Sequence, residues 1–294
     1  AEDGIRDCLL SRGLGDVYKR QFFNCHNDFF EEIAKFRAAR TLWHDLMTTR
    51  YAPENPKSSM LRFHTQVAGV SLTAQQPLNN VARVTIQALA AVLGGTQSLH
   101  TNSYDEALGL PTEASATVAL RTQQIIAEES GVADTVDPIA GSWHVEQLTK
   151  KIYDSAMELI NVIEDKGGAL AAIEQGWQQQ EIHLSAYQYL NEIEKNQRNI
   201  VGVNYGTMDE TEGIPIMKTD ATLGERQTER LAALRSSRDA DAVSHALDAV
   251  RQAAENGTNL FPLVIDAVRH RATLGDIIND MTDVFGTFIA PSGF

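Results

Sequence analysis

The chain has 294 residues, of which 22% are charged and 43% hydrophobic, a balance typical of a soluble globular protein with one large or two small domains. Its 25 basic and 39 acidic residues give a net charge of −14, which argues against nucleic acid or an anionic membrane as a partner. No apolar run approaches the roughly 18 residues of a membrane span.

Cysteine is scarce, with only Cys8 and Cys25 present. Neither residue lies in a cysteine and histidine spacing that would suggest zinc. Low cysteine use fits a reducing compartment, so we expect a cytoplasmic protein.

Residues 1–21 carry neither a helical nor an alternating pattern, unlike the rest of the chain. They resemble the translated adapter sequences found at the ends of metagenomic open reading frames. We therefore expect a non-native leader that takes no part in the fold.

The first regular elements follow this leader. Asn27 and Asp28 can cap a helix over 29–50, which the prolines that follow would end. Residues 61–67 then alternate between apolar and polar, which predicts a strand with His64 and Gln66 on one face.

A second helix and strand come next. Thr73 with Gln76 resembles a capping box and predicts a helix that runs to about Leu93. Gly94 and Gly95 close this helix, and 96–101 reads as a strand. Strand, helix and strand with short joins form the parallel crossover unit, so we expect an α/β fold.

The chain beyond Pro111 is predicted to be mostly helical, with short apolar pieces at 200–205 and 214–217 that are either strands or extended connectors. The expected helices cover 112–130, 143–166, 169–197, 220–236, 239–256, 259–271 and 273–284.

The stretch 96–111 joins a short strand directly to a polar loop that holds Asn102, Asp105 and Glu106. Ligands bind at this end of a strand in parallel α/β folds. The alternative is an ordinary strand-to-helix turn whose polar side chains only cap the next helix.

Several segments together resemble one family. These are LRFHTQVAGVSLTAQQPLNNVARVTIQALAAVLGGT followed by QSLHTNSYDEALGLPTE, and also FFEEIAKFRAARTLW, LRTQQIIAEESGVADTVDPIAGSW and IVGVNY. From about Phe22 to the C-terminus the chain is similar to the large, catalytic subunit of the methylmalonyl-CoA mutase family, which are adenosylcobalamin-dependent acyl-CoA mutases. The resemblance implies that 22–135 is the C-terminal part of a (β/α)8 TIM barrel and that 136–294 is a helical extension.

The resemblance also implies a substrate site. His64 and Gln66 match catalytic residues that line the acyl-CoA cavity, and Gln97 matches a substrate contact. The alternative for His64 is an interior histidine whose hydrogen bonds are satisfied within the protein.

A cofactor site follows from the same resemblance. Asn102 and Glu106 match groups near the adenosyl moiety, and a carboxylate can accept hydrogen bonds from both ribose hydroxyls. Gly69 matches a glycine that lets the backbone approach the corrin, and small or apolar side chains would face the ring. The alternatives are a turn glycine, a solvated loop acid and loop packing. The remaining members of this predicted site are Ala107, Gly109 and Leu110.

Two features of the family have no match in this sequence. The Arg-x-Ser element that contacts CoA is replaced by Lys19 and Gln21, and no histidine lies in the Asp-x-His-x-x-Gly motif that ligates cobalt. We therefore predict no metal ligand in this chain and expect the cobalt ligand on a separate small cobalamin-binding subunit. The sequence looks like the second part of a gene.

The leading hypothesis is a large-subunit fragment that rearranges the carbon skeleton of a short branched acyl-CoA, by default methylmalonyl-CoA to succinyl-CoA. Isobutyryl-, 2-hydroxyisobutyryl- and ethylmalonyl-CoA are alternative substrates, because the side chains that distinguish them precede this segment in the family. A different class of function is a catalytically inert fragment that only associates with a partner subunit. A barrel enzyme of other chemistry is a third hypothesis, since a barrel fold does not fix function.

Overall fold

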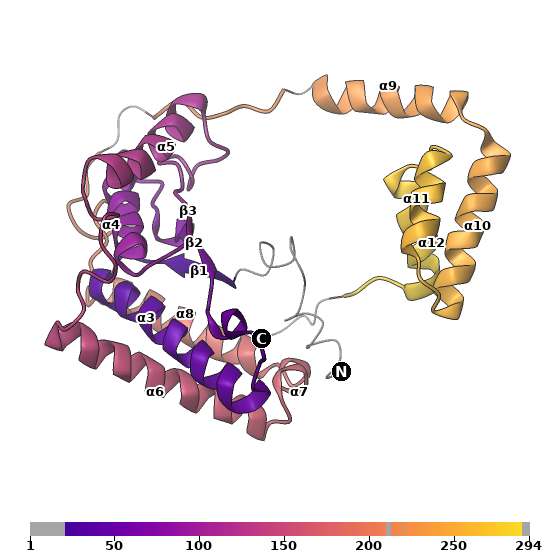
Figure 1. Cartoon of the computed structure of the whole chain (residues 1–294). Coiled ribbons are helices and arrows are strands. Elements are labelled where there is room, and N and C mark those ends of the chain that lie inside the picture. The colour runs from indigo at the N-terminus through magenta and orange to yellow at the C-terminus, as the bar shows by residue number, and fades with distance from the viewer. Residues whose placement is uncertain (1–20, 210–212, 221, 290–294) are drawn as a thin grey trace. The chain divides into compact units, whose positions relative to one another are not determined.

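The computed structural model describes residues 21–209, 213–220 and 222–289 (Figure 1). The leader predicted at 1–21 lies outside these residues, except for Gln21, which begins the first strand. By its internal contacts the chain divides into two compact units, residues 1–217 and 218–294.

The first unit contains a three-stranded parallel sheet with the strand order β1-β2-β3. Its strands are β1 (Gln21–Cys25), β2 (Phe63–Val67) and β3 (Ser98–His100). Helix α3 (Phe29–Leu46) connects β1 to β2, and α4 (Asn79–Leu93) connects β2 to β3. This helix-rich fold with a small parallel sheet confirms the prediction of an α/β protein.

Helix α3 begins where the sequence predicts. The carboxylate of Asp28 accepts a hydrogen bond from the backbone N–H of Glu31 and so caps the first turn. The last turn widens into the π-helical η1 (Met47–Tyr51), and the 3₁₀ turn η2 (Pro56–Ser59) follows.

The capping box predicted at Thr73 and Gln76 is wrong. Helix α4 begins at Asn79 after the 3₁₀ turn η3 (Gly69–Ser71), and Gln76 has a φ of 47° that no helix accepts. The side chain of Asn80 makes two hydrogen bonds to the backbone of Thr73. It donates to the carbonyl at 2.9 Å and accepts from the N–H at 3.1 Å. The local hydrogen bonds of Thr73 therefore stabilise a turn that precedes the helix.

The buried faces of the sheet explain why the strands alternate. Phe63, Thr65 and Val67 are fully buried, while His64 and Gln66 between them are half-buried. This confirms the two faces predicted for 61–67, although the strand itself starts at Phe63. The core beneath the sheet contains Cys25, Ile33, Phe36, Leu61, Phe63, Ala90, Ala91 and Val145, and a second cluster contains Val67, Leu72, Val84, Ala88 and Ile126.

The turn between α4 and β3 packs closely against α3. A Cβ at Gly94 would lie 2.5 Å from Cδ2 of Phe36, and Gly95 has a φ of 82°. The guanidinium of Arg40 donates to the carbonyl of Gly94, and burial lowers the pKa of this arginine. Only glycine allows this approach.

The helices after β3 agree with the predicted ones, with a single interruption. They are α5 (Glu113–Glu128), α6 (Trp143–Asp165), α7 (Ala169–Glu174) and α8 (Trp177–Glu194). The helix predicted over 169–197 is divided at Gly176, whose φ of 73° is left-handed.

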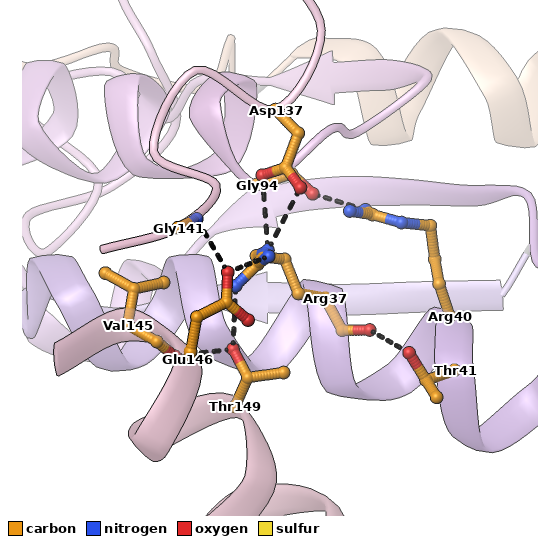
Figure 2. A network of polar contacts seen from close by, with 9 residues as sticks. All are labelled: Arg37, Arg40, Thr41, Gly94, Asp137, Gly141, Val145, Glu146 and Thr149. Atoms are coloured by element: carbon orange, nitrogen blue, oxygen red, sulfur yellow. Dashed lines mark hydrogen bonds and ion pairs between the residues drawn. The ribbon is translucent and has the colours of Figure 1, made fainter. Parts of the chain in front are cut away.

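Helix α6 packs along α3, and a polar network fixes the pair (Figures 1 and 2). Arg37 of α3 is only 11% exposed at its side chain and contacts Asp137 at 3.2 Å and Glu146 at 2.8 Å. It also donates to the hydroxyl of Thr149 at 3.2 Å. Hydrogen bonds from Arg37 and from the N–H of Gly141 lower the pKa of Glu146.

The segment 200–206 returns to the loop that precedes α4. An isolated bridge joins Val201 to Tyr205, while 214–217 contains no regular element. Arg83 of α4 donates to the carbonyl of Val201 at 2.7 Å, and Gln76 donates to the carbonyl of Gly206 at 2.9 Å. The predicted apolar piece at 200–205 is thus a connector of the first unit that is hydrogen-bonded to α4 and to the loop before it.

The second unit consists of helices alone in its described residues. They are α9 (Thr222–Ser237), α10 (Ala240–Asn256), α11 (Phe261–Arg269) and α12 (Leu274–Phe285). Helices α10 to α12 pack around their own core of Val243, Ala246, Val250, Ala267, Ala272 and Ile277. In the described parts of both units, no helix combines the length and apolar character needed to cross a bilayer.

Candidate functional site

His64 lies on the half-buried face of the central strand β2, between β1 and β3. The register pairs Phe22 of β1 with His64, and His64 with Ser98 of β3. The ring of Phe22 lies 4.8 Å from the imidazole at a tilt of 57°, and Ser98 Oγ lies 2.6 Å from Nδ1. His64 is therefore held by one neighbour from each adjacent strand.

Gln66 occupies the next position toward the carboxyl end of the sheet. The register pairs it with Asn24 on β1 and His100 on β3. Its amide donates to Oδ1 of Asn102 at 3.1 Å, and Asn102 in turn donates to the carbonyl of Val67 at 3.1 Å. Asn102 is only 2% exposed. Through its hydrogen bond it joins Gln66 to the loop that follows β3.

Gly69 follows the end of β2 and lies against the loop that follows β3. A Cβ at this position would lie 2.8 Å from Nδ2 of Asn102 and 3.4 Å from both Cγ and Oε1 of Glu106. The missing side chain is what allows Asn102 and Glu106 to approach the end of β2. The structure thus brings Asn102 and Glu106 next to Gly69 and joins Gln66 to Asn102. His64 lies on the same face of β2 as Gln66.

Asp105 organises the loop that carries Glu106. Its side chain is 1% exposed and accepts from the backbone N–H of Thr112 at 3.1 Å. Its carbonyl accepts from the N–H groups of Leu108 and Gly109 at 2.8 and 3.1 Å. The loop therefore turns around a buried carboxylate and leaves Glu106 exposed.

The predicted corrin-facing residues all lie on the outer surface of this loop. Ala107, Gly109 and Leu110 are exposed, and no heavy atom lies within 4 Å of a Cβ built at Gly109. Together with Glu106 they give a small, open and partly apolar surface beside one carboxylate.

Gln97 lies apart from the residues around Gln66. Its carbonyl oxygen accepts from the N–H of Phe63 at 2.7 Å, and its amide donates to the carbonyl of Gly95 at 2.7 Å. Gln97 also lines a groove of about 390 Å³ between β3 and α5. Its side chain is thus bonded to backbone near the amino ends of β2 and β3.

Sequence reasoning did not identify Phe22 or Ser98, and it named Asp105 only as a polar residue of the loop and not as its buried centre. The first two reach His64 only through the register of parallel strands, for which the local sequence carries no signal. The role of Asp105 in the turn could have been predicted from the sequence. It lies between Asn102 and Glu106 and precedes a proline by six residues, a setting that favours a turn. No group of three or more His, Cys, Asp or Glu side chains suited to a metal ion occurs within the described residues.

Comparison with known proteins gives a consistent result. The family model described as methylmalonyl-CoA mutase matches residues 18–287. The chain is 45% identical over 269 residues to the 2-hydroxyisobutanoyl-CoA mutase large subunit of Aquincola tertiaricarbonis, which covers 91% of this chain and 48% of that protein.

Two further relatives carry the family name. The mitochondrial methylmalonyl-CoA mutase of Bos taurus is 45% identical over 267 residues, which covers 90% of this chain and 36% of that protein. The methylmalonyl-CoA mutase of Escherichia coli (strain K12) is 43% identical over 272 residues, which covers 92% and 38%. The chain therefore spans less than half the length of these curated relatives.

Proposed function

Because the chain belongs to the methylmalonyl-CoA mutase family, we propose that it is part of the large subunit of an adenosylcobalamin-dependent acyl-CoA mutase. Its relatives are named mutases, which are isomerases that transfer a group within one molecule. The proposed reaction is the radical rearrangement of the carbon skeleton of a short branched acyl-CoA, with methylmalonyl-CoA to succinyl-CoA as the default.

The observation that carries this proposal is that Asn102 and Glu106 lie beside Gly69 and that Asn102 accepts a hydrogen bond from Gln66. His64 lies on the same face of β2 as Gln66. These side chains come from the ends of two adjacent parallel strands, the position at which α/β folds bind ligands. We infer that the three strands are the last strands of a (β/α)8 barrel over 22–135 and that 136–294 is its helical extension. The leader proposed at 1–21 would end before Gln21, because this residue pairs with Phe63 in the sheet.

The residues around Gly69 fit a large flat cofactor. The glycine lets Asn102 and Glu106 approach the end of β2 closely, and the loop over 107–110 presents small or apolar residues on its surface. Glu106 would accept hydrogen bonds from the ribose hydroxyls, and Gly69, Ala107, Gly109 and Leu110 would contact the corrin. The bound cofactor supplies the radical that starts the rearrangement.

The chain's own residues bind and orient the substrate in this proposal. His64 and Gln66 face the same side of the sheet and would contact the acyl thioester, while Asn102 holds the amide of Gln66 in place. Gln97 is proposed as a further substrate contact, although its present hydrogen bonds go to backbone groups. No titrating acid or base is required in this proposal. The residues of the chain would orient the substrate and exclude water, and the bound cofactor would supply the radical chemistry.

A 2-hydroxyisobutanoyl-CoA mutase large subunit is the second candidate, supported by the Aquincola tertiaricarbonis relative. The words large subunit in that name support a small subunit as partner, and we propose that this partner carries cobalamin and the cobalt ligand. The proposed location is the cytoplasm.

The proposal can be tested with a hybrid large subunit. Residues 22–294 are joined to the preceding part of the Aquincola tertiaricarbonis protein and produced with that protein's small subunit. We expect turnover of a branched acyl-CoA that requires adenosylcobalamin, whereas the 294-residue chain with the small subunit alone should be inactive. A folded hybrid that binds neither cofactor nor acyl-CoA would support the inert fragment instead.

Glu106→Gln gives the sharper test of the cofactor site. Losing charge-assisted hydrogen bonds should weaken adenosylcobalamin binding by about 10- to 100-fold. Glu113→Gln is the matched control, because Glu113 is an exposed acid in the first turn of α5 outside the site. Equal affinity in the two variants would remove Glu106 from the proposed site.

A further inference from the structure

Asn80 is a fully buried polar side chain in the first turn of α4. Because its exposed fraction is 0%, its amide must find its hydrogen-bond partners within the protein. A side-chain amide has two donor hydrogens and an oxygen that accepts two hydrogen bonds. All four of these positions are occupied in Asn80.

The amide nitrogen of Asn80 binds two separate loops. Nδ2 donates to the carbonyl of Thr73, in the turn after β2, and to the carbonyl of Tyr104, in the loop after β3, both at 2.9 Å. Tyr104 lies two residues from Asn102 and two residues from Glu106. One buried amide thus joins the turn that follows β2 to the loop that carries the candidate cofactor residues.

The amide oxygen of Asn80 determines the orientation of the group. Oδ1 accepts from the backbone N–H of Thr73 at 3.1 Å and from Nη1 of Arg83 at 2.7 Å. If the amide were turned over, its NH₂ would face these two donors and its oxygen would face two carbonyls. The neighbours therefore permit one orientation, in which Nδ2 faces the carbonyl of Tyr104.

We propose that Asn80 is a positioning residue that holds the loop over 102–109 in place. Asn102 attaches the start of this loop to β2, and the bond from Asn80 to Tyr104 attaches its middle to α4. Glu106 follows two residues later and depends on this second attachment for its place beside the end of β2. The effect on adenosylcobalamin rests on the proposed function, whereas the placement of the loop does not.

The first test is hydrogen exchange of the full 294-residue chain, followed by mass spectrometry of peptides that cover 102–110. Asn80→Asp keeps the shape of the side chain but sets an oxygen against the carbonyl of Tyr104. We therefore expect the loop amides to exchange about tenfold faster, as for the loss of one hydrogen bond. The amides that report on the loop donate to carbonyls within it and belong to Glu106, Leu108 and Gly109.

Asn79→Asp is the matched control, because it makes the same change one residue away, where the side chain is exposed. Its exchange over 102–110 should equal that of the native chain. Peptides of α3 should exchange at the native rate in every variant. An equal rise in α3 and in the loop would overturn the proposal, because it would reflect a general loss of stability.

Asn80→Ala is the second variant, since it removes the bond to Tyr104 without adding a charge. Its loop amides should also exchange faster. Unchanged exchange over 102–110 in both Asn80 variants would overturn the proposal. So would the loss of the helical circular dichroism signal in both, because Asn80 would then support the whole fold and not this loop.

A double-mutant cycle in the hybrid large subunit tests whether Asn80 acts through Glu106. We expect Asn80→Asp to weaken adenosylcobalamin binding about tenfold when Glu106 is present, but about twofold or less in the Glu106→Gln hybrid. A purely structural role would give the same loss in both backgrounds, and that result would overturn the action through Glu106.

The two tests separate this inference from the proposed function. If exchange of the loop responds to Asn80 while the native hybrid binds no adenosylcobalamin, the positioning role stands and the proposed function fails. If the native hybrid binds the cofactor while Asn80→Asp changes neither the exchange nor the affinity, the inference fails and the proposed function stands.

Discussion

Gly69 is the residue with the least room in the candidate site. In Gly69→Ala the new Cβ would lie 2.8 Å from Nδ2 of Asn102, so the amide must leave the Val67 carbonyl or Gln66. We expect a loss of about 1–3 kcal/mol in the free energy of unfolding, as for other overpacked sites, and weaker adenosylcobalamin binding. Thermal unfolding and cofactor titration measure the two effects.

Gly109→Ala serves as the stability control for this change. The position lies in the adjacent loop, its φ is not left-handed, and an added Cβ meets nothing within 4 Å. Its melting temperature should match that of the native chain. Equal losses in both variants would contradict a specific clash at Gly69.

Asp276 predicts how the second unit responds to acid. Burial raises its pKa, but hydrogen bonds from Arg238 and from Thr273 outweigh this and hold the pKa at about 2. The pKa is thus lower in the folded than in the unfolded state, so the stabilisation is complete above about pH 4 and is lost as the pH falls toward 2. A shift of this size corresponds to about 2 kcal/mol.

Urea unfolding of the unit that contains α10 to α12 should therefore show Asp276→Asn about 2 kcal/mol less stable than the native protein at pH 7. The difference should shrink as the pH approaches 2. Asp248→Asn removes the same charge from an exposed position on α10 and should change stability little. A deficit in Asp276→Asn that is independent of pH would contradict the role of the carboxylate charge.

At the scale of the elements, the pairing of α3 with α6 depends on Arg37. Arg37→Met keeps an apolar stem but leaves Asp137 and Glu146 without their shared cation. We expect a loss of about 2 kcal/mol because the arginine side chain is largely buried. Thermal unfolding followed by circular dichroism measures the loss.

Arg50→Met is the matched control, since Arg50 of η1, which follows α3, contacts Glu164 of α6 at 2.7 Å but both side chains are well exposed. Such surface pairs contribute little, so its melting temperature should barely change. If both variants melt alike, burial of Arg37 does not decide the strength of the contact.

The elements show what the sequence could predict. The alternation of apolar and polar residues predicted the two faces of β2, and the capping side chain of Asp28 predicted the start of α3. The prediction failed at Thr73, whose backbone exchanges two hydrogen bonds with the side chain of Asn80 in a turn before the helix. It also failed at Gly176, where one left-handed glycine divides the predicted helix.

The candidate site was predictable to a different degree. The resemblance supplied His64, Gln66 and the residues after β3, and these remain predictions as regards their roles. The partners of His64 could not be predicted, because Ser98 and Phe22 reach it from other strands. Parallel strands separated by whole helices leave no local trace of which residues will be neighbours.

At the scale of the molecule, the second unit has a core of its own. Val250 and Ala267 are fully buried within 218–294, and Thr273 with Asp276 forms a complete capping box. We expect residues 218–294 to fold alone into a helical domain with a cooperative thermal transition, seen by circular dichroism. Val250→Asp should abolish this transition, and a non-cooperative melt of the native segment would show that its core is insufficient.

The two hydrogen bonds from Gln76 and Arg83 to the segment 200–206 have an evolutionary consequence. A gene crossover between codons 83 and 201 would combine Arg83 from one parent with the segment 200–206 from the other, although the two are hydrogen-bonded in the fold. Viable natural mosaics of this family should therefore exchange the intervening stretch as one block, or place their junctions beyond residue 206.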